Sequence, residues 1–187
     1  MTMCLMCDGF GHDDVMALYG AHIAEYGFTV VAVTAARPED EGVEWAYTID
    51  LLDAAGHPEL VVAGPDAASG GHLLQALGRE ILAGERYSIG DVLGDPPAVL
   101  RFGPVDAVQH DLGTFADWYS AQVAGHIRAP RLEVLQVFAP DTWFCACHRG
   151  HQPDLADPHT RLDARPVPNR AMRRSRARSD RRRTHPR

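Results

Sequence analysis

The stretch from Trp45 to Gly64 constrains the fold of this chain more than any other part of the sequence. Large apolar residues alternate with smaller or polar ones along its first half: Trp45, Tyr47, Ile49 and Leu51. This period of two predicts a strand with one buried face. Turn-forming residues follow from Asp53 to Pro58, and the apolar run from Leu60 to Gly64 predicts a second strand covered on both faces. The sequence therefore predicts a β-hairpin at the centre of the fold.

Further helices and strands are expected around this hairpin. Apolar residues at helical spacing predict about three helices: 13–26, 73–84 and 111–126. Runs of β-branched and other apolar residues predict three more strands: 28–34, 99–105 and 132–138. The Gly103-Pro104 break favours an edge position for the 99–105 strand. Taken in order, these elements predict a single-domain α+β sandwich with a mostly antiparallel sheet.

The charge distribution divides the chain into an acidic body and a basic end. Residues 161–187 hold eleven Arg against two carboxylates, whereas residues 1–160 hold seven Arg against twenty-three carboxylates. A segment so basic and so poor in apolar side chains cannot bury enough surface to offset its ordering entropy. We therefore expect a globular domain over 1–152 and a Pro/Arg-rich tail over 153–187, disordered beyond about residue 160.

Composition also limits the chemistry and the cellular location. All eighteen basic residues are Arg, so no Schiff-base, pyridoxal-phosphate or P-loop lysine exists in this chain. The first ten residues lack the basic region and long apolar stretch of a signal peptide. The longest uncharged apolar run, residues 28–36, is far too short to span a membrane. The sequence therefore predicts a cytoplasmic protein with no membrane contact.

Several motifs resemble those of the bacterial domain-of-unknown-function family 4262. They cover roughly residues 4–143: Cys4-x2-Cys7, Tyr26-Gly27-Phe28, Trp45-Ala46-Tyr47-Thr48-Ile49, Gly56-His57-Pro58-Glu59-Leu60, the 74–84 helix, and Leu135-Gln136-Val137-Phe138 with Pro140-Asp141. Members of that family usually have Gly where Asp50 stands and a Leu-like residue where Pro65 stands. Many end in a Trp-Pro-Trp-Asp-like segment, where this chain has residues 143–148. The resemblance implies no established activity, so any function of 143–148 is specific to this branch.

Cysteines and histidines near both ends form the strongest candidate metal site. They are Cys4, Cys7, Cys145, Cys147, His148 and His151. Zn²⁺ binds four thiolate or imidazole ligands in a tetrahedron, and a C-x2-C pair supplies two of them. The segment 145–151 would supply the other two and bring the chain ends together. Four protein ligands would make the site structural; the alternative is that these are free thiols.

An arginine-rich run near the C-terminus is the second candidate site. Its members are Arg173, Arg174, Arg176, Arg178, Arg181, Arg182 and Arg183. Such a run would bind a phosphate backbone by counterion release, and without aromatic residues it offers no stacking platform for sequence-specific readout. The alternatives are a solvated tail and a tail folded onto the acidic body of the same protein.

Other motifs are weaker. The Gly-rich turn 64–71 joins a strand to a helix and predicts helix initiation, with Asp66 or Ser69 as cap, rather than an anion site. We expect His57 and His72 to be solvated, because they lie in a turn and on a helix flank. His22 and His126 lie near apolar helix faces and are expected in the core.

These observations favour a non-catalytic binding or regulatory domain, with a structural zinc site and a tail that contacts nucleic acid or another polyanion. The first alternative is a small metal-dependent, hydrolase-like enzyme that uses the Cys/His cluster, with Asp50 or Glu59 as base. The second is an acidic module that neutralises a basic protein partner. A contiguous exposed acidic or apolar patch would favour this last function. The sequence leaves open whether the protein is an enzyme.

Overall fold

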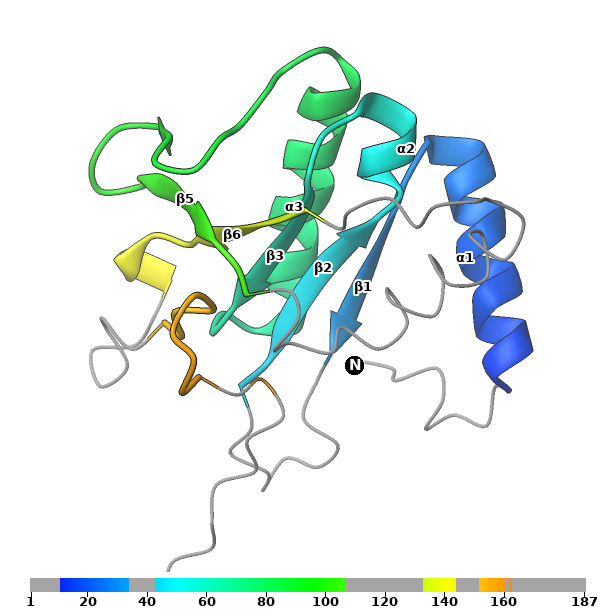
Figure 1. Ribbon diagram of the computed structural model, residues 1–187, viewed down its shortest axis with the longest axis horizontal. Helices are drawn as coiled ribbons and strands as arrows, with labels where there is room; N and C mark the ends of the chain where they lie inside the picture. Colours follow the sequence, from blue (N-terminus) through cyan, green and yellow to red (C-terminus); the bar gives the residue numbers. More distant parts are fainter. Residues whose placement is uncertain (1–10, 34–42, 107–132, 144–151, 161, 163–187) are drawn as a thin grey trace, which may run out of the picture.

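A six-stranded sheet organises the computed structural model, which describes residues 11–33, 43–106, 133–143, 152–160 and 162 (Figure 1). The strands are β1 (Thr29–Val33), β2 (Trp45–Ile49), β3 (Glu59–Ala63), β4 (Val92–Leu93), β5 (Leu100–Pro104) and β6 (Val134–Phe138). The helices are α1 (His12–Tyr26), α2 (Leu51–Ala55), α3 (Ala67–Leu82) and the 3-10 helix η1 (Asp141–Trp143). The sheet order is β1-β2-β3-β6-β5-β4, and only the β3–β6 pair is parallel among these neighbours. The predicted α+β fold with a mostly antiparallel sheet is confirmed.

The predicted central hairpin is present as the antiparallel pair β2–β3, with Tyr47 opposite Val61. All five residues of β2 are buried, so this strand is covered on both faces and the expectation of one buried face was wrong. Large and small side chains therefore alternate between two buried faces of β2. Trp45 and Tyr47 face one core cluster, and Ala46 faces the other. Leu51, expected as the end of the strand, begins the short helix α2.

Helix α3 covers one face of the sheet and lies behind β2 and β3 in Figure 1. Its buried residues include Leu74, Leu77 and Ile81. The close approach of α3 to the sheet depends on two glycines. A Cβ at Gly78 would lie 2.4 Å from the Phe28 ring, and one at Gly70 would lie 2.9 Å from Val62 Cγ1. The small residues of α3 and β2 therefore let the helix backbone lie directly on the strands.

Helix α1 and the segment after residue 152 pack on the opposite cluster. Tyr19 and Ile23 of α1 lie against this cluster, which also contains fully buried Leu155 and nearly buried Leu162. Described residues on both sides of the expected boundary at 152/153 therefore pack onto the sheet. Figure 1 shows the segment 152–160, in orange, beside the lower end of β5, and its Leu155 belongs to the cluster opposite α3. The described fold consequently has three layers.

Local expectations differ from the structure at several places. β5 lies between β6 and β4 and is not an edge strand of the described sheet. The two-residue strand β4 is too short to produce a visible period in the sequence. Helix α3 begins at Ala67, with Asp66 as the predicted cap: its side chain accepts a hydrogen bond from Ser69 N at 2.9 Å. The helix expected over 111–126 lies outside the described residues.

Candidate functional site

The carboxylate of Glu59 is completely buried at the start of β3 and accepts three hydrogen bonds. Thr48 Oγ1 donates to Glu59 Oε2 at 2.6 Å. The backbone N–H groups of Asp50 and Leu52 donate to Glu59 Oε1 at 2.9 and 3.1 Å. Thr48 Oγ1 in turn accepts from Leu60 N at 2.8 Å. One side chain therefore connects β2, the turn after it and the first turn of α2.

His57 is also buried, which corrects the expectation that it is solvated. Its Nδ1 lies 2.6 Å from Pro58 O, and Tyr87 N donates to Nε2 at 3.1 Å. These contacts require the neutral tautomer with hydrogen on Nδ1, because Nε2 must accept. Burial lowers the pKa of His57 below its ordinary value, and the nearby Arg86 acts in the same direction. His57 thus holds the backbone of the loop that follows α3.

The side chain of Tyr87 extends this contact to the core. Its ring stacks on Phe102 with centroids 4.6 Å apart, and its hydroxyl donates to Glu80 Oε2 at 2.5 Å. Burial and the Glu80 carboxylate raise the pKa of Tyr87. Next to it, Arg86 Nη2 donates to Ala55 O at 2.7 Å, which fixes the loop to the end of α2. The loop is therefore attached at both of these residues.

Gln136 is the buried polar residue of β6. Its Nε2 donates to Pro153 O at 2.5 Å, and its Oε1 accepts from Leu155 N at 2.8 Å. An amide on the apolar face of a central strand would be costly without such partners. The segment 152–160 therefore satisfies a polar group that the sheet would otherwise leave buried and unpaired.

Sequence reasoning did not identify Glu59, His57 and Gln136 as a set of buried polar residues. Each stands beside apolar residues in a strand or turn. Glu59 binds Thr48, Gln136 binds Leu155 and His57 binds Tyr87, and these partners lie 11, 19 and 30 residues away in the chain. In the described residues, every buried side-chain nitrogen or oxygen has a hydrogen-bond partner. Glu59 is inaccessible to solvent and both of its carboxylate oxygens accept hydrogen bonds. It is therefore not placed to act as the base of the alternative enzyme.

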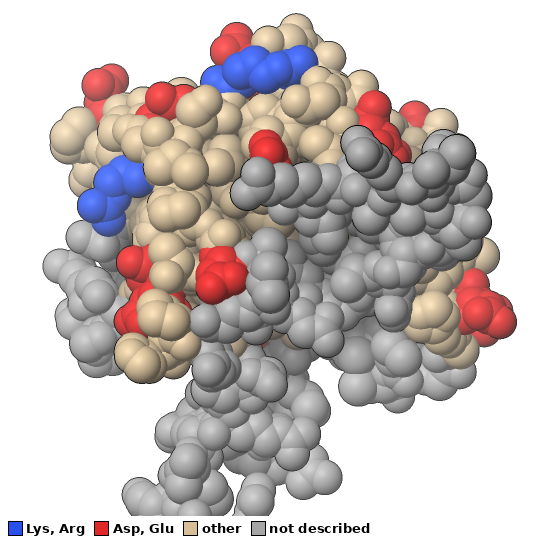
Figure 2. Space-filling view, viewed as in Figure 1, with Lys and Arg blue, Asp and Glu red and all other residues tan. Residues whose placement is uncertain are grey.

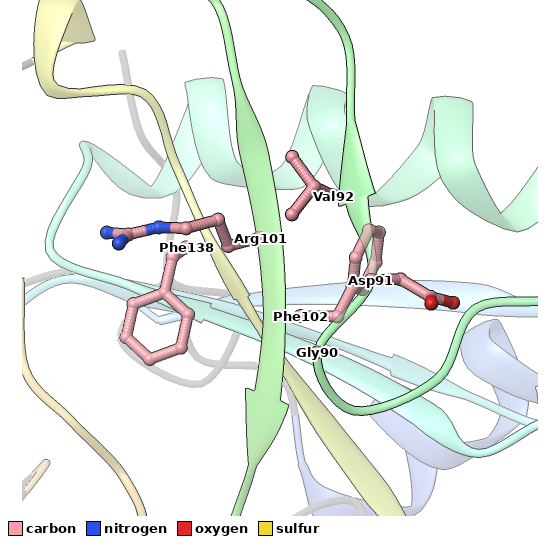
Figure 3. A pocket seen from close by; sticks show the side chains of 6 residues that line it. All are labelled: Gly90, Asp91, Val92, Arg101, Phe102 and Phe138. Carbon is pink, nitrogen blue, oxygen red and sulfur yellow. The ribbon is translucent and has the colours of Figure 1, made fainter.

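A shallow hollow of about 260 Å³ lies beside β4 and β5. Its lining is mostly apolar and consists of Gly90, Asp91, Val92, Arg101, Phe102 and Phe138. Figure 3 shows Arg101 and Phe138 on one side of β5 and Asp91 on the other. The Arg101 guanidinium lies over the Phe138 ring, 5.7 Å from its centroid, so this cation is held by an aromatic face. The hollow contains no pair of groups arranged for proton transfer.

The predicted metal ligands and the predicted polyanion-binding arginines lie outside the described residues. This applies to Cys4, Cys7, Cys145, Cys147, His148 and His151, and to Arg173, Arg174, Arg176, Arg178, Arg181, Arg182 and Arg183. Within the described ranges, no three His, Cys, Asp or Glu residues are grouped so that they could hold a metal ion. The described elements next to the two cysteine pairs, the start of α1 and η1, lie on opposite sides of Figure 1.

The described part of the chain is strongly acidic. It contains seventeen Asp and Glu residues and three arginines: Arg79, Arg86 and Arg101. Figure 2 shows acidic side chains spread over several parts of the visible face and basic ones at two places. No helix in the described ranges is long and apolar enough to cross a membrane.

Comparison with known families identifies the family of this chain. Residues 22–143, more than half of the chain, match the family described as Domain of unknown function (DUF4262). The chain belongs to this family. The match excludes both cysteine pairs, the segment 152–160 and the arginine-rich run. No curated protein and no solved structure matches the chain.

The turn after β2 has an unusual backbone conformation in this DUF4262 chain. Asp50 has φ +87° and is the positive-φ residue other than Gly among the described residues. This left-handed conformation suits Gly, and Asp tolerates it better than most other residues. The turn is needed because it aims the N–H groups of Asp50 and Leu52 at Glu59. The Gly preference and the buried carboxylate therefore belong to one local structure.

Replacing Glu59 tests whether this carboxylate holds the fold together. We expect Glu59→Leu to lower the free energy of unfolding by at least about 3 kcal/mol, because three donors lose their acceptor inside the core. Glu59→Gln, which keeps one carbonyl oxygen, should cost less than half as much. Urea unfolding monitored by Trp fluorescence measures both. Equal losses for the two variants would contradict the assignment of the energy to hydrogen bonding.

The neutral state of His57 predicts a pH dependence of stability. The unfolded state, with the ordinary His pKa of 6.5, binds more protons than the folded state below that pH. The contribution of neutral His57 to the free energy of unfolding should therefore be complete above about pH 6.5. It should decrease as the pH falls toward the lowered folded-state pKa, by up to about 1.4 kcal/mol per pH unit. Urea titrations between about pH 7 and 5 measure this slope.

Two histidine variants test whether His57, and no other titratable group, causes this pH dependence. His57→Gln should flatten the slope, whereas the exposed His72→Gln should leave it unchanged. The same slope in His57→Gln as in the parent protein would show that another group causes the pH dependence.

Proposed function

We propose that this protein is a non-catalytic binding protein whose arginine-rich run contacts nucleic acid or another polyanion. This proposal is supported by the separation of basic and acidic residues along the chain. Residues 161–187 hold eleven of the eighteen arginines, and the described domain holds three against seventeen carboxylates. An acidic domain repels a phosphate backbone, so attachment would depend on the basic run.

The organisation of the buried polar groups supports a binding role over a catalytic one. Catalytic groups need access to substrate and a pKa matched to their task. In the described core, Glu59 and Gln136 are fully buried and hydrogen-bonded to backbone groups. Their arrangement stabilises the fold and offers no reacting group to a cleft.

The proposal includes a zinc ion held by ligands from Cys4, Cys7, Cys145, Cys147, His148 and His151. Thiolates and imidazoles in this number suit the tetrahedral preference of Zn²⁺. Because α1 begins and η1 ends on opposite sides of Figure 1, one shared site would require both chain ends to converge. That convergence would place the start of the basic tail near the N-terminus.

A protein-neutralising function is a second candidate, favoured by the surface around β4. Ile89 and Val92 are each 63% exposed, and Leu93 is 37% exposed. The exposed carboxylates of Asp91 and Asp95 lie in the same stretch. Apolar side chains with an acidic surround suit a basic protein partner.

Polyanion binding by the basic run is tested with charge-changing variants of the full chain. One variant replaces all seven arginines of the run by Gln, and its matched control replaces them by Lys. The residues are Arg173, Arg174, Arg176, Arg178, Arg181, Arg182 and Arg183. The probes are a labelled single-stranded RNA and a labelled duplex DNA of about 20 nucleotides, measured by fluorescence anisotropy. If all seven side chains contact phosphates, log K for duplex DNA should fall with log salt at a slope of about −6.

The two variants should behave differently. We expect the Gln variant to lose at least about 100-fold in affinity at low salt, whereas the Lys variant should stay within a few-fold, since charge dominates. Unchanged, salt-independent binding of the Gln variant would overturn the proposal. The parent protein could instead bind the probes weakly at low salt and more tightly when salt screens the acidic body. That result would overturn the proposal, because it would show that the tail is held by its own domain.

The zinc site is tested by elemental analysis of the untagged full chain with thiol counting. We expect about one zinc per chain, with thiols masked until denaturation or chelation. Cys147→Ser should lower the zinc content, while His159→Ala, a change at an exposed residue outside the ligand set, should not. Four freely reactive thiols in metal-free native protein would contradict this part of the proposal.

A further inference from the structure

The segment 152–160 packs on one face of the sheet and folds into turns from Leu155 onward, with Asp157 N donating to Asp154 O at 3.2 Å and Thr160 N donating to Asp157 O at 3.0 Å. Its backbone also makes hydrogen bonds to the domain. Gln136 binds both Pro153 O and Leu155 N, and Asp106 N donates to Leu155 O at 3.0 Å. In return, Gln152 Nε2 donates to Val137 O at 3.3 Å. Backbone contacts of this kind hold a peptide whatever its side chains.

Leu155 is the more deeply buried of two leucines at this end of the chain: it is completely buried in the cluster that contains Tyr47 and Val61, which Leu162 also joins. The neighbours Asp154 and Asp157 are exposed. An apolar anchor between exposed polar residues, combined with backbone hydrogen bonds, is an arrangement that peptide-binding domains use.

The binding surface and the segment belong to different parts of the chain. Gln136, Asp106 and the socket residues Tyr47, Val61 and Val134 lie inside the DUF4262 match over 22–143, whereas the segment lies beyond it. The surface is therefore part of the family domain, and what fills it here is an extension. Without an occupant, the Gln136 amide and the socket for Leu155 would lose their partners, so this surface requires an occupant that supplies the same groups.

We propose that this face of the sheet is a peptide-binding site, which the segment 152–160 fills in cis. The partner is a peptide with the pattern Pro-X-Leu that turns after its Leu in the same way. The carbonyl of its Pro and the N–H of its Leu, two residues apart, bind the Gln136 side-chain amide, and its Leu enters the socket. Pro at the first position fixes φ and so reduces the conformational entropy that the peptide loses on binding. This inference does not depend on polyanion binding by the tail.

The tethered segment controls access to the site. A flexible tether gives an attached ligand an effective concentration in the millimolar range. A free peptide of the same sequence therefore competes poorly, and binding of a partner requires higher affinity or release of the segment. Occupation of the site by a partner would free the segment from which the basic tail continues.

The experiment uses the full chain and a labelled peptide of residues 152–162 as the probe. Leu155→Asp in the chain places a carboxylate in the socket and should vacate the site, whereas His159→Ala is a matched change at an exposed residue of the same segment. We expect the Leu155→Asp chain to bind the peptide at least about tenfold more tightly than the parent and His159→Ala chains. A probe carrying Asp in place of its Leu should not bind. Adding Gln136→Leu to the vacated chain should abolish binding.

Each other outcome decides against the proposal. A folded Leu155→Asp chain that binds neither probe, or both equally, would show that no specific site exists. If that chain does not fold, hydrogen exchange of the parent protein decides instead. Exchange of the Leu155 and Asp106 amides at a lower opening free energy than the β6 amides would show that the segment detaches as a unit. Equal opening free energies would make it an integral part of the fold and overturn the proposal.

Discussion

The buried carboxylate of Glu59 is the contact on which the centre of this DUF4262 domain depends. It accepts hydrogen bonds from β2, from the left-handed turn at Asp50 and from the first turn of α2. The turn and the helix need such a contact most, because α2 is only five residues long and Asp50 has a backbone conformation that favours Gly. A fully buried charge is tolerable only when donors surround it. The turn and short helix supply these donors, and the hairpin register follows from their placement.

The two faces of the sheet are closed by different means. On one face, Gly70 and Gly78 let α3 lie close against the side chains of Val62 and Phe28, so this layer is held mainly by apolar packing. On the other face, α1 leaves room that Leu155 fills, and the Gln136 amide binds the backbone of the segment that carries it. A long helix packed along the strands is harder to detach than a short segment held by few buried side chains and backbone hydrogen bonds. This asymmetry connects the fold to the proposed peptide site.

The charge pattern separates two tasks within one chain. An acidic, well-packed domain cannot itself attract a phosphate backbone, and an arginine-rich run has no core of its own. The segment 152–160 lies between them in the sequence. If both proposals hold, binding of a peptide at the sheet face would release this segment and change the accessibility of the start of the basic run.

The sequence by itself determined the features that depend on neighbouring residues or on composition. The hairpin of β2 and β3, the α1 helix ending at Gly27, the Asp66 cap and the acidic and basic halves follow from local periodicity, turn chemistry and residue counts. The family could also be recognised from its motifs. The burial of His57, the cover on both faces of β2, the internal position of β5, and the hydrogen bonds of Glu59 to Thr48 and of Gln136 to Leu155 depend on how the strands and segments assemble. The physical reason is that burial and hydrogen bonding of a polar side chain depend on which strands and segments meet it, and no local pattern contains that information.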